Sequence, residues 1–350
     1  MPMPRPGRLH WPGTCCGSIH ARTSIVAMIP ASASSLPLVA VVTPVHNGAA
    51  YLAETMKSVQ AQDYPNIVHV LLENASTDAT SEIIATFEGG RIPLTVGHNS
   101  TLLPMIDNWN KALTMIPETA AYFMVLCADD ALRPDAVSRM VAVAESDPMV
   151  MAVTSAVTRN DVVVDFGWPK DMTVYDGPDV IHRLFRETPI TDARSAMFRR
   201  PADMEKPFFD PSLYSSEDTE ALLRVISRGK MGFVHEPIIM VREHENNMSN
   251  AVARPMGLQF LDHFVVIERY APVGRGVDSR QAIYRDYRRY YIRRLLIWRW
   301  IDGNRRAYDY HMGKLADLRT RPRLLEYADA AIDLLLKRVR LRPKLYAFPG

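Results

Sequence analysis

Apolar runs of strand length alternate with segments of helical periodicity between Leu38 and Cys127, and this alternation constrains the fold more than any other feature. The strand-like runs are 38–43, 67–73, 93–96 and 122–127, and the helical segments are 50–61, 77–87 and 105–116. Parallel strands need crossover connections, which are nearly always right-handed. The pattern therefore predicts an α/β fold, in which helices cover both faces of a doubly wound sheet.

The second half of the chain mixes strands with helices and then becomes entirely helical. Strands are expected near 150–157, 162–166 and 231–242, and helices near 179–187 and 217–228. Residues 1–36 contain prolines, show no sustained period and lack the ordered regions of a signal peptide. We therefore expect a disordered segment (1–36), an α/β domain (37–250) and a helical C-terminal extension (251–350).

The composition is that of a globular protein with a substantial core. Of 350 residues, 47% are apolar and 23% are charged, and the formal net charge is +2. No apolar run approaches the roughly 18 residues that cross a bilayer. The three cysteines, Cys15, Cys16 and Cys127, lack zinc spacing, so a reducing, cytoplasmic location fits them best. The absence of a Walker A loop argues against kinases and ATPases.

Two adjacent carboxylates, Asp129 and Asp130, follow the apolar run 122–127 and precede a helix that starts near Pro134. Open α/β sheets bind ligands at the carboxyl ends of their strands, and carboxylate oxygens are suitable ligands for hard divalent cations. The acid pair therefore indicates a metal site. The alternative is a surface turn, because Asp side chains often accept hydrogen bonds from backbone amides there.

The ends of the first two strands carry further candidate ligand-binding residues. Asn47 and Gly48 allow a sharp turn, so that the backbone can approach a flat ligand such as a base. Glu73, at the end of the second strand, can accept hydrogen bonds from a nucleobase or a ribose. Helix capping by the following Ser76 or Thr77 is the alternative. A base site and a metal site on one edge together suggest a nucleoside diphosphate.

At this point the chain resembles the family 2 glycosyltransferases, which are inverting, metal-dependent transferases with the GT-A fold. The resemblance covers about residues 38 to 248. It depends on six motifs in order, at 43–52 (TPVHNGAAYL), 58–66 (SVQAQDYPN), 73–78 (ENASTD), 108–112 (NWNKA), 128–130 (ADD) and 217–218 (ED).

The resemblance implies a role for each matching residue. The nucleotide pocket would contain Thr43, Pro44, His46, Asn47, Glu73, Asn108, Ala128 and Asp129. Asp129 and Asp130 would hold Mn²⁺ or Mg²⁺, and Asp218 would be the catalytic base. The chain departs from the family pattern at Glu73, where Asp is usual, and at Cys127, where an acid is common. The second departure leaves the metal with fewer protein oxygens.

Further roles are implied around the acceptor and the diphosphate. His244 would ligate the metal and Arg242 would pair with phosphate oxygens, although both could also be ordinary surface residues. Glu217, Ser195 and Met197 would contact the acceptor. The alternative for the acids at 217–218 is a favourable interaction with a helix dipole.

Arginines and aromatic residues are interleaved between 281 and 300. Tyr284, Tyr287, Tyr291, Leu295 and Trp298 fall on one helical face. This helix could lie on an anionic membrane, pack against the catalytic domain, or form a homo-oligomer interface. Nucleic-acid binding is not expected, because the net charge is nearly balanced and no recognition motif occurs.

The sequence thus predicts a cytoplasmic inverting glycosyltransferase, peripheral at the inner face of the membrane if the 281–300 helix binds lipid. It would transfer a sugar from a UDP-sugar donor to a hydroxyl of a glycan or lipid-linked glycan, in surface polysaccharide or lipopolysaccharide synthesis. The alternative is a noncatalytic nucleotide-sugar-binding or scaffolding protein on a degenerate GT-A fold. A sugar nucleotidyltransferase fits less well, because no glycine-rich basic loop follows the first strand.

Overall fold

The computed structural model describes residues 36–185, 191–201, 204, 207–244, 253–271 and 277–338. The expected disordered segment therefore lies almost wholly outside the described residues. The described chain divides into two compact units. Unit 1 contains the residues up to Val174, those of 191–208, and Gly232–Arg242. Unit 2 contains the residues from Tyr175 to 185, Phe209–Met231, and those from Glu243 onward.

A mixed ten-stranded sheet is the main feature of the α/β part, as predicted. Its strands are β1 (Leu38–Val45), β2 (Ile67–Glu73), β3 (Leu94–His98), β4 (Ala120–Val125), β5 (Ala131–Leu132), β6 (Val150–Arg159), β7 (Val162–Val164), β8 (Val174–Asp176), β9 (Met197–Arg199) and β10 (Lys230–Val241). Along the sheet the order is β3-β2-β1-β4-β9-β6-β10-β5, with β7 paired to β6 and β8 to β10. The pairs among β1 to β4 are parallel, whereas β9 is antiparallel to β4 and to β6.

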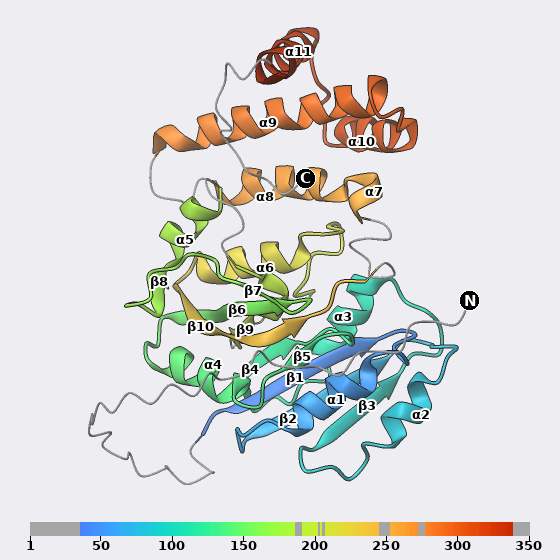
Figure 1. Ribbon diagram of the computed structural model, residues 1–350, viewed down its shortest axis with the longest axis vertical. Coiled ribbons are helices and arrows are strands. Elements are labelled where there is room, and N and C mark those ends of the chain that lie inside the picture. The colour runs from blue at the N-terminus through green and yellow to red at the C-terminus, as the bar shows by residue number, and fades with distance from the viewer. Residues whose placement is uncertain are drawn as a thin grey trace. The chain divides into compact units, whose positions relative to one another are not determined.

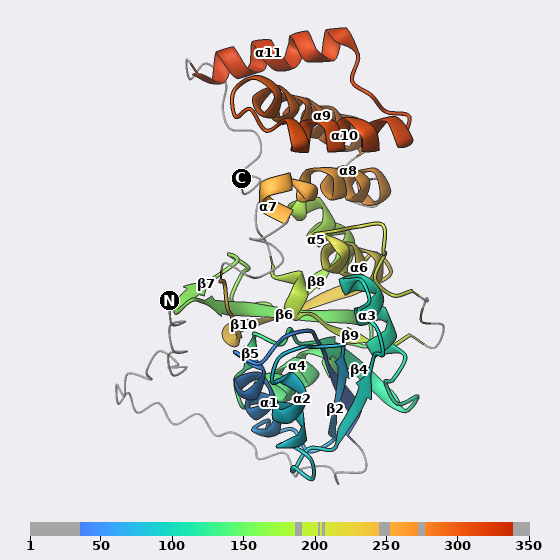
Figure 2. The same ribbon diagram turned by 90° about the vertical axis from the view of Figure 1, so that its right-hand side faces the viewer.

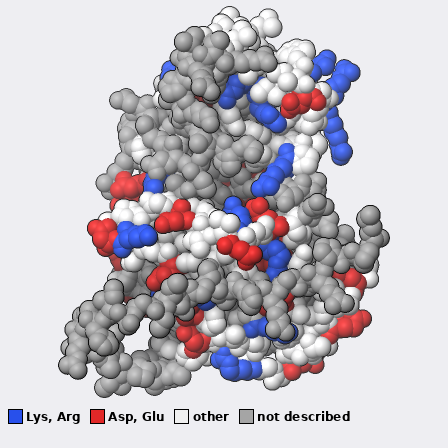
Figure 3. Space-filling model, in the orientation of Figure 1, with Lys and Arg blue, Asp and Glu red and all other residues white. Residues whose placement is uncertain are grey.

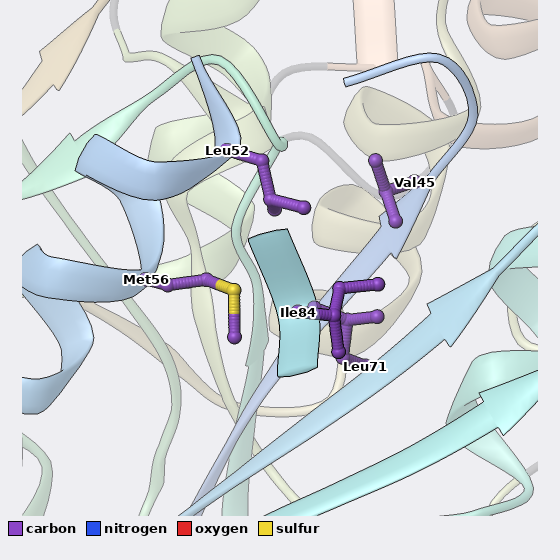
Figure 4. Close-up of a cluster of buried hydrophobic side chains, with 5 residues drawn as sticks. All are labelled: Val45, Leu52, Met56, Leu71 and Ile84. Carbon is purple, nitrogen blue, oxygen red and sulfur yellow. The ribbon is translucent and has the colours of Figure 1, made fainter. Parts of the chain in front are cut away.

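Helices cover both faces of the parallel part, as the alternating pattern predicts. The helices of unit 1 are α1 (Leu52–Gln60), α2 (Thr80–Ala85), α3 (Met105–Leu113) and α4 (Ala136–Glu145). Figure 4 shows Leu52 and Met56 of α1 and Ile84 of α2 gathered with Val45 and Leu71 of the sheet. Successive strand residues point to opposite faces, so Leu72 lies on the other face. There it adjoins Gly97 and Met115, just beyond α3.

Unit 2 contains the predicted C-terminal helices together with α5 and α6. Its helices are α5 (Gly177–Leu184), α6 (Glu217–Ile226), α7 (Arg254–Met256), α8 (Leu258–Tyr270), α9 (Val277–Trp300), α10 (Arg305–Asp317) and α11 (Leu324–Arg338). In both ribbon views α9 lies between α8 and α11 (Figures 1 and 2). No helix in the described ranges is long and apolar enough to cross a membrane.

The aromatic face of α9 forms the core of this helical group. Tyr287, Tyr291 and Trp298 are almost fully buried, and their rings contact Phe260 or a neighbouring aromatic ring. A Cβ at Gly257, whose φ is +65°, would lie 2.3 Å from the Trp298 ring, so the packing requires glycine there. The aromatic face of the 281–300 helix is therefore buried among the C-terminal helices themselves, which disfavours its use on a membrane.

Charged side chains of both signs are interspersed over unit 1 on the face drawn in Figure 3. Around α10 of unit 2 basic side chains are the more frequent. Exposed cations there include Arg305, Arg306 and Lys314.

Candidate active site

The loops that follow β1 and β2 are joined by hydrogen bonds at the carboxyl edge of the sheet. The backbone N–H of Asn47 donates to Ser76 Oγ (3.0 Å), and the N–H of Thr77 donates back to Asn47 Oδ1 (2.8 Å). The N–H of Gly48 donates to Thr80 Oγ1 (2.8 Å). Asn47 has a φ of +50°, a conformation that Asn tolerates better than most residues. The structure therefore gives Asn47 a role in shaping the loop, and its neighbour His46 contacts the Asn74 carbonyl oxygen through Nδ1.

Glu73 ends β2 as a largely buried carboxylate. Its Oε1 accepts a hydrogen bond from the N–H of Ser76, and its Oε2 lies 3.5 Å from His98 Nδ1. Burial raises the pKa of Glu73, but the hydrogen bonds from Ser76 and His98 more than offset it, so the pKa lies below its ordinary value. Glu73 is thus an anion at neutral pH. Glu73 bonds within its own loop. Because α2 begins at Thr80 and its N-cap residue is Ala79, neither Ser76 nor Thr77 caps that helix.

Three buried asparagines connect the second loop to α3. Asn99 donates through Nδ2 to Asn74 Oδ1 and to Asn108 Oδ1, both at 2.8 Å. The Lys111 ammonium donates to Asn99 Oδ1 at 2.6 Å. Asn108 is therefore an internal member of this network, which fixes the loop behind Glu73.

The acid pair lies beyond β4 and forms a cluster with Cys127. One ligand atom from each of Cys127, Asp129 and Asp130 lies within 4.8 Å of the others, and no further such group of three occurs in the described ranges. Burial and the Asp129 charge raise the pKa of Asp130 to about 8. Burial and the two carboxylates also raise the pKa of the Cys127 thiol. A bound cation would relieve this mutual repulsion, so the donor set fits a divalent metal.

Arg242, directly after β10, binds several groups around the acid cluster. Its N–H donates to Asp130 Oδ1 (2.9 Å), and its guanidinium donates to the Asp129 carbonyl oxygen (3.1 Å) and to Glu54 Oε2 (2.7 Å). The guanidinium also lies over the Tyr51 ring, 4.3 Å from its centroid. The structure thus brings Arg242 to the acids, as expected.

Sequence reasoning missed Tyr51, Glu54 and Thr55, which are neighbours of the acid cluster. Tyr51 precedes α1, and it was not singled out within the 43–52 motif. Thr55 Oγ1 lies 2.9 Å from the Ala128 carbonyl oxygen and 2.8 Å from that of Asp130, which attaches α1 to the acid loop. The sequence signal for Thr55 was its polar side chain among the buried apolar positions of α1.

Several expected site residues have a structural role in unit 1. Thr43 and Pro44 are buried in β1, and Thr43 Oγ1 lies 2.9 Å from His69 Nε2. Met197 is fully buried in β9, where it pairs with Met124 of β4, so it contributes to the core. Ser195 is also buried, and its Oγ donates to the Asp192 carbonyl oxygen at 3.0 Å. Acceptor contacts of Ser195 and Met197 remain predictions, which the burial of both side chains disfavours.

The expected base and its neighbours belong to unit 2. Asp218 is half-buried in the first turn of α6, and Glu217 beside it is buried. The preceding segment is fixed by Asp262 of α8, whose Oδ2 accepts hydrogen bonds from the N–H groups of Tyr214 (2.8 Å) and Ser215 (2.6 Å). His244 also lies in unit 2 and is not a member of the Cys127 cluster.

Comparison with known proteins gives the fold and acid cluster a family context. Residues 40–205 match the family model described as Glycosyl transferase family 2. An uncharacterized glycosyltransferase of Rickettsia typhi is 24% identical over 223 residues, which cover 61% of this chain and 66% of that protein. An uncharacterized protein of Mycobacterium tuberculosis is 25% identical over 239 residues, 62% of this chain and 72% of its own length. The aligned part is thus just under two thirds of the first relative.

Solved structures share the architecture at low sequence identity. TarS of S. aureus in complex with UDP-GlcNAc aligns with a TM-score of 0.54 and 16% identity, covering 87% of this chain and 83% of that chain. The mannosyltransferase PcManGT of Pyrobaculum calidifontis, in complex with GDP-Man and Mn²⁺, aligns with a TM-score of 0.51 and 18% identity, covering 88% and 84%. The mixed sheet and these alignments show a GT-A fold. Residues 40–205 match the model of glycosyltransferase family 2, which bears out the resemblance stated above.

Proposed function

We propose that this chain is an inverting glycosyltransferase that transfers a sugar from a nucleotide-sugar donor, with UDP as the first candidate nucleotide, to a hydroxyl of a glycan or lipid-linked glycan. The observation that supports this most directly is the cluster of Asp129 and Asp130 on the sheet edge that also carries Glu73. A metal site and an anionic hydrogen-bond acceptor on one edge suit a nucleoside diphosphate.

Each residue has a defined task in this proposal. Glu73 accepts hydrogen bonds from the base or ribose, and Asp129 and Asp130 hold Mn²⁺ or Mg²⁺. When bound there, a divalent cation would neutralise the negative charge that develops on the departing diphosphate. Arg242 contributes a second positive charge to the phosphates, in competition with Glu54. Asp218 takes the proton of the acceptor hydroxyl as its oxygen attacks the anomeric carbon opposite the leaving group.

The solved neighbours support the donor class. TarS was solved with UDP and with UDP-GlcNAc, and PcManGT with GDP-Man and Mn²⁺. Both nucleotides are therefore candidates for this chain, and Mn²⁺ is the first metal to test. A place in surface polysaccharide or lipopolysaccharide synthesis, at the inner face of the membrane, completes the proposal.

Calorimetric titration tests the donor site directly. The purified chain is titrated with UDP, GDP, CDP and dTDP, each in Mn²⁺ and in EDTA. We expect metal-dependent binding of one nucleotide, which names the donor class for subsequent transfer assays with its sugars. Absence of binding in both conditions would contradict the proposal. Binding without transfer to any glycan acceptor would favour the noncatalytic alternative.

A further inference from the structure

Helix α11 presents charged side chains to its neighbour α9 and apolar side chains to solvent. Arg293 of α9 pairs with Asp333 at 2.5 Å, and both side chains are almost fully buried. Arg288 and Arg289 of α9 form two further, more exposed ion pairs, with Glu326 and Asp329 of α11. Around these pairs lies a small apolar cluster of Ile292, Leu296 and Ala330, with Tyr327 and Ala331 beside it.

The opposite side of α11 is an exposed apolar face. Leu324 is 88% exposed, Leu325 84%, Ile332 53% and Leu335 64%. At 3.6 residues per turn these four positions fall within about 100° of one another around the helix axis, and Ala328 lies among them. Single exposed apolar residues are common, but a continuous leucine-rich face marks an interaction surface.

Basic residues precede this face. Arg319, Arg321 and Arg323 lie before the helix and are exposed. The acids of α11 are Glu326, Asp329 and Asp333, and each is paired with an arginine of α9. Because the arginines of α9 neutralise these carboxylates, the acids of α11 do not repel an anionic partner at the apolar face.

The charge pattern distinguishes between two occupants of the face. A second copy of α11 would bring its own arginines to those of the first and offers them only acids that already pair with α9, which is unfavourable. An anionic bilayer accepts the arginines before the helix in its headgroups while the leucines enter the boundary between headgroups and acyl chains. We propose that the exposed face of α11 docks the protein on a bilayer surface that contains anionic lipid.

This inference does not depend on the proposed transferase activity. It also differs from the sequence-based membrane alternative, because the aromatic face of the 281–300 helix is buried. An apolar face rimmed by cations is the expected form of an interfacial helix.

Sedimentation of the full chain with lipid vesicles tests the proposal. The vesicles are phosphatidylcholine alone or mixed with phosphatidylglycerol, and the variants are Leu325→Glu/Ile332→Glu and Arg321→Glu/Arg323→Glu. Both variants alter exposed side chains, and circular dichroism checks that each remains folded. Val162→Glu, at a 65% exposed position of β7, is the matched control.

We expect the parent and the control to bind the anionic vesicles, less so at high salt, and to bind the neutral vesicles weakly. Each double variant should bind the anionic vesicles about tenfold less or weaker still. Equal binding by parent and leucine variant would overturn the proposal, as would absence of parent binding. If light scattering instead detects a dimer that the leucine variant abolishes, without vesicle binding, a second copy is the occupant and the proposal is wrong.

Discussion

At the residue scale, three titratable side chains at the end of β4 oppose one another's ionisation in the free protein. Asp130 is buried beside Asp129, and Cys127 completes the group. Arg242 partly compensates, since its N–H donates to Asp130, but its guanidinium is shared with Glu54. The group therefore has capacity for an additional positive charge.

Substitution of Cys127 tests how many ligands the metal receives from the chain. Cys127→Asp adds a carboxylate to the cluster and should tighten Mn²⁺-dependent nucleotide binding about tenfold, since hard cations prefer oxygen ligands. Asp129→Ala should weaken nucleotide binding in Mn²⁺ and leave it nearly unchanged in EDTA. Calorimetry in both conditions measures the effects. Identical affinities of Asp129→Ala and parent in Mn²⁺ would refute the metal assignment.

The base assignment is tested by a change that leaves size almost unaltered. Asp218→Asn removes the proton acceptor and should lower the transfer rate by about 10² to 10⁴-fold. Binding of the nucleotide with Mn²⁺ should stay as in the parent, because Asp218 is given no donor contact. A radiolabelled-sugar transfer assay and calorimetry separate the two effects. Parallel loss of binding would show that Asp218 supports the fold and is not the base.

At the scale of elements, a close approach in unit 2 demands glycine. Gly177 begins α5, and its N–H donates to the Gly229 carbonyl oxygen (3.0 Å) just beyond α6. A Cβ at Gly177 would lie 1.8 Å from the Ile226 carbonyl oxygen. Only a movement of the backbone could remove this steric clash. The contact between α5 and the end of α6 therefore depends on the missing side chain.

Two glycine-to-alanine changes give opposite expectations. Gly177→Ala should destabilise the protein by about 2 kcal/mol or more, because the clash is with backbone. Gly313→Ala, in the middle of α10 where a Cβ meets nothing within 4 Å, should stabilise it by about 0.5–1 kcal/mol. Thermal unfolding followed by circular dichroism compares both with the parent. An unchanged midpoint for Gly177→Ala would contradict the packing described.

The long elements could be predicted from the sequence, whereas the short ones could not. The predicted strands 38–43 and 67–73 match β1 and β2 closely because each is a continuous buried run. β5, β8 and β9 contain two or three residues, too few to show a period. At the site, the acid pair was found from its position after a strand, and Arg242 from the resemblance to the family. The contact of Arg242 with Glu54 joins residues 188 positions apart, which no local pattern reveals.

At the scale of the whole molecule, each unit contains a buried neutral histidine. His69 in unit 1 and His311 in unit 2 have no exposed surface, and burial lowers the pKa of each to about 4. The unfolded chain, with an ordinary histidine pKa near 6.5, binds more protons between these values. The stability contributed by each neutral histidine is therefore lost as pH falls from about 6.5 to about 4. Asp262 acts in the opposite sense, because burial raises its pKa to about 6.

A variant of His69 separates the contribution of this histidine to the pH dependence of stability from those of His311 and Asp262. His69→Gln retains a group able to bond with Thr43 and cannot be protonated. The stability difference between parent and variant should shift in favour of the variant by up to about 3 kcal/mol as pH falls from 7 to 4. Urea unfolding at a series of pH values measures this shift. A difference that is constant with pH would show that His69 does not titrate in this way.

The hydrogen bonds between the loops after β1 and β2 have a consequence for ligand selectivity. In the site that we propose for the donor base, Asn47 and Gly48 are held by Ser76, Thr77 and Thr80 in the free chain, so the conformational entropy of this surface is lost during folding and not during binding. A surface ordered in advance cannot widen for a larger ring system. Discrimination between a purine and a pyrimidine should accordingly be set by shape at the first encounter.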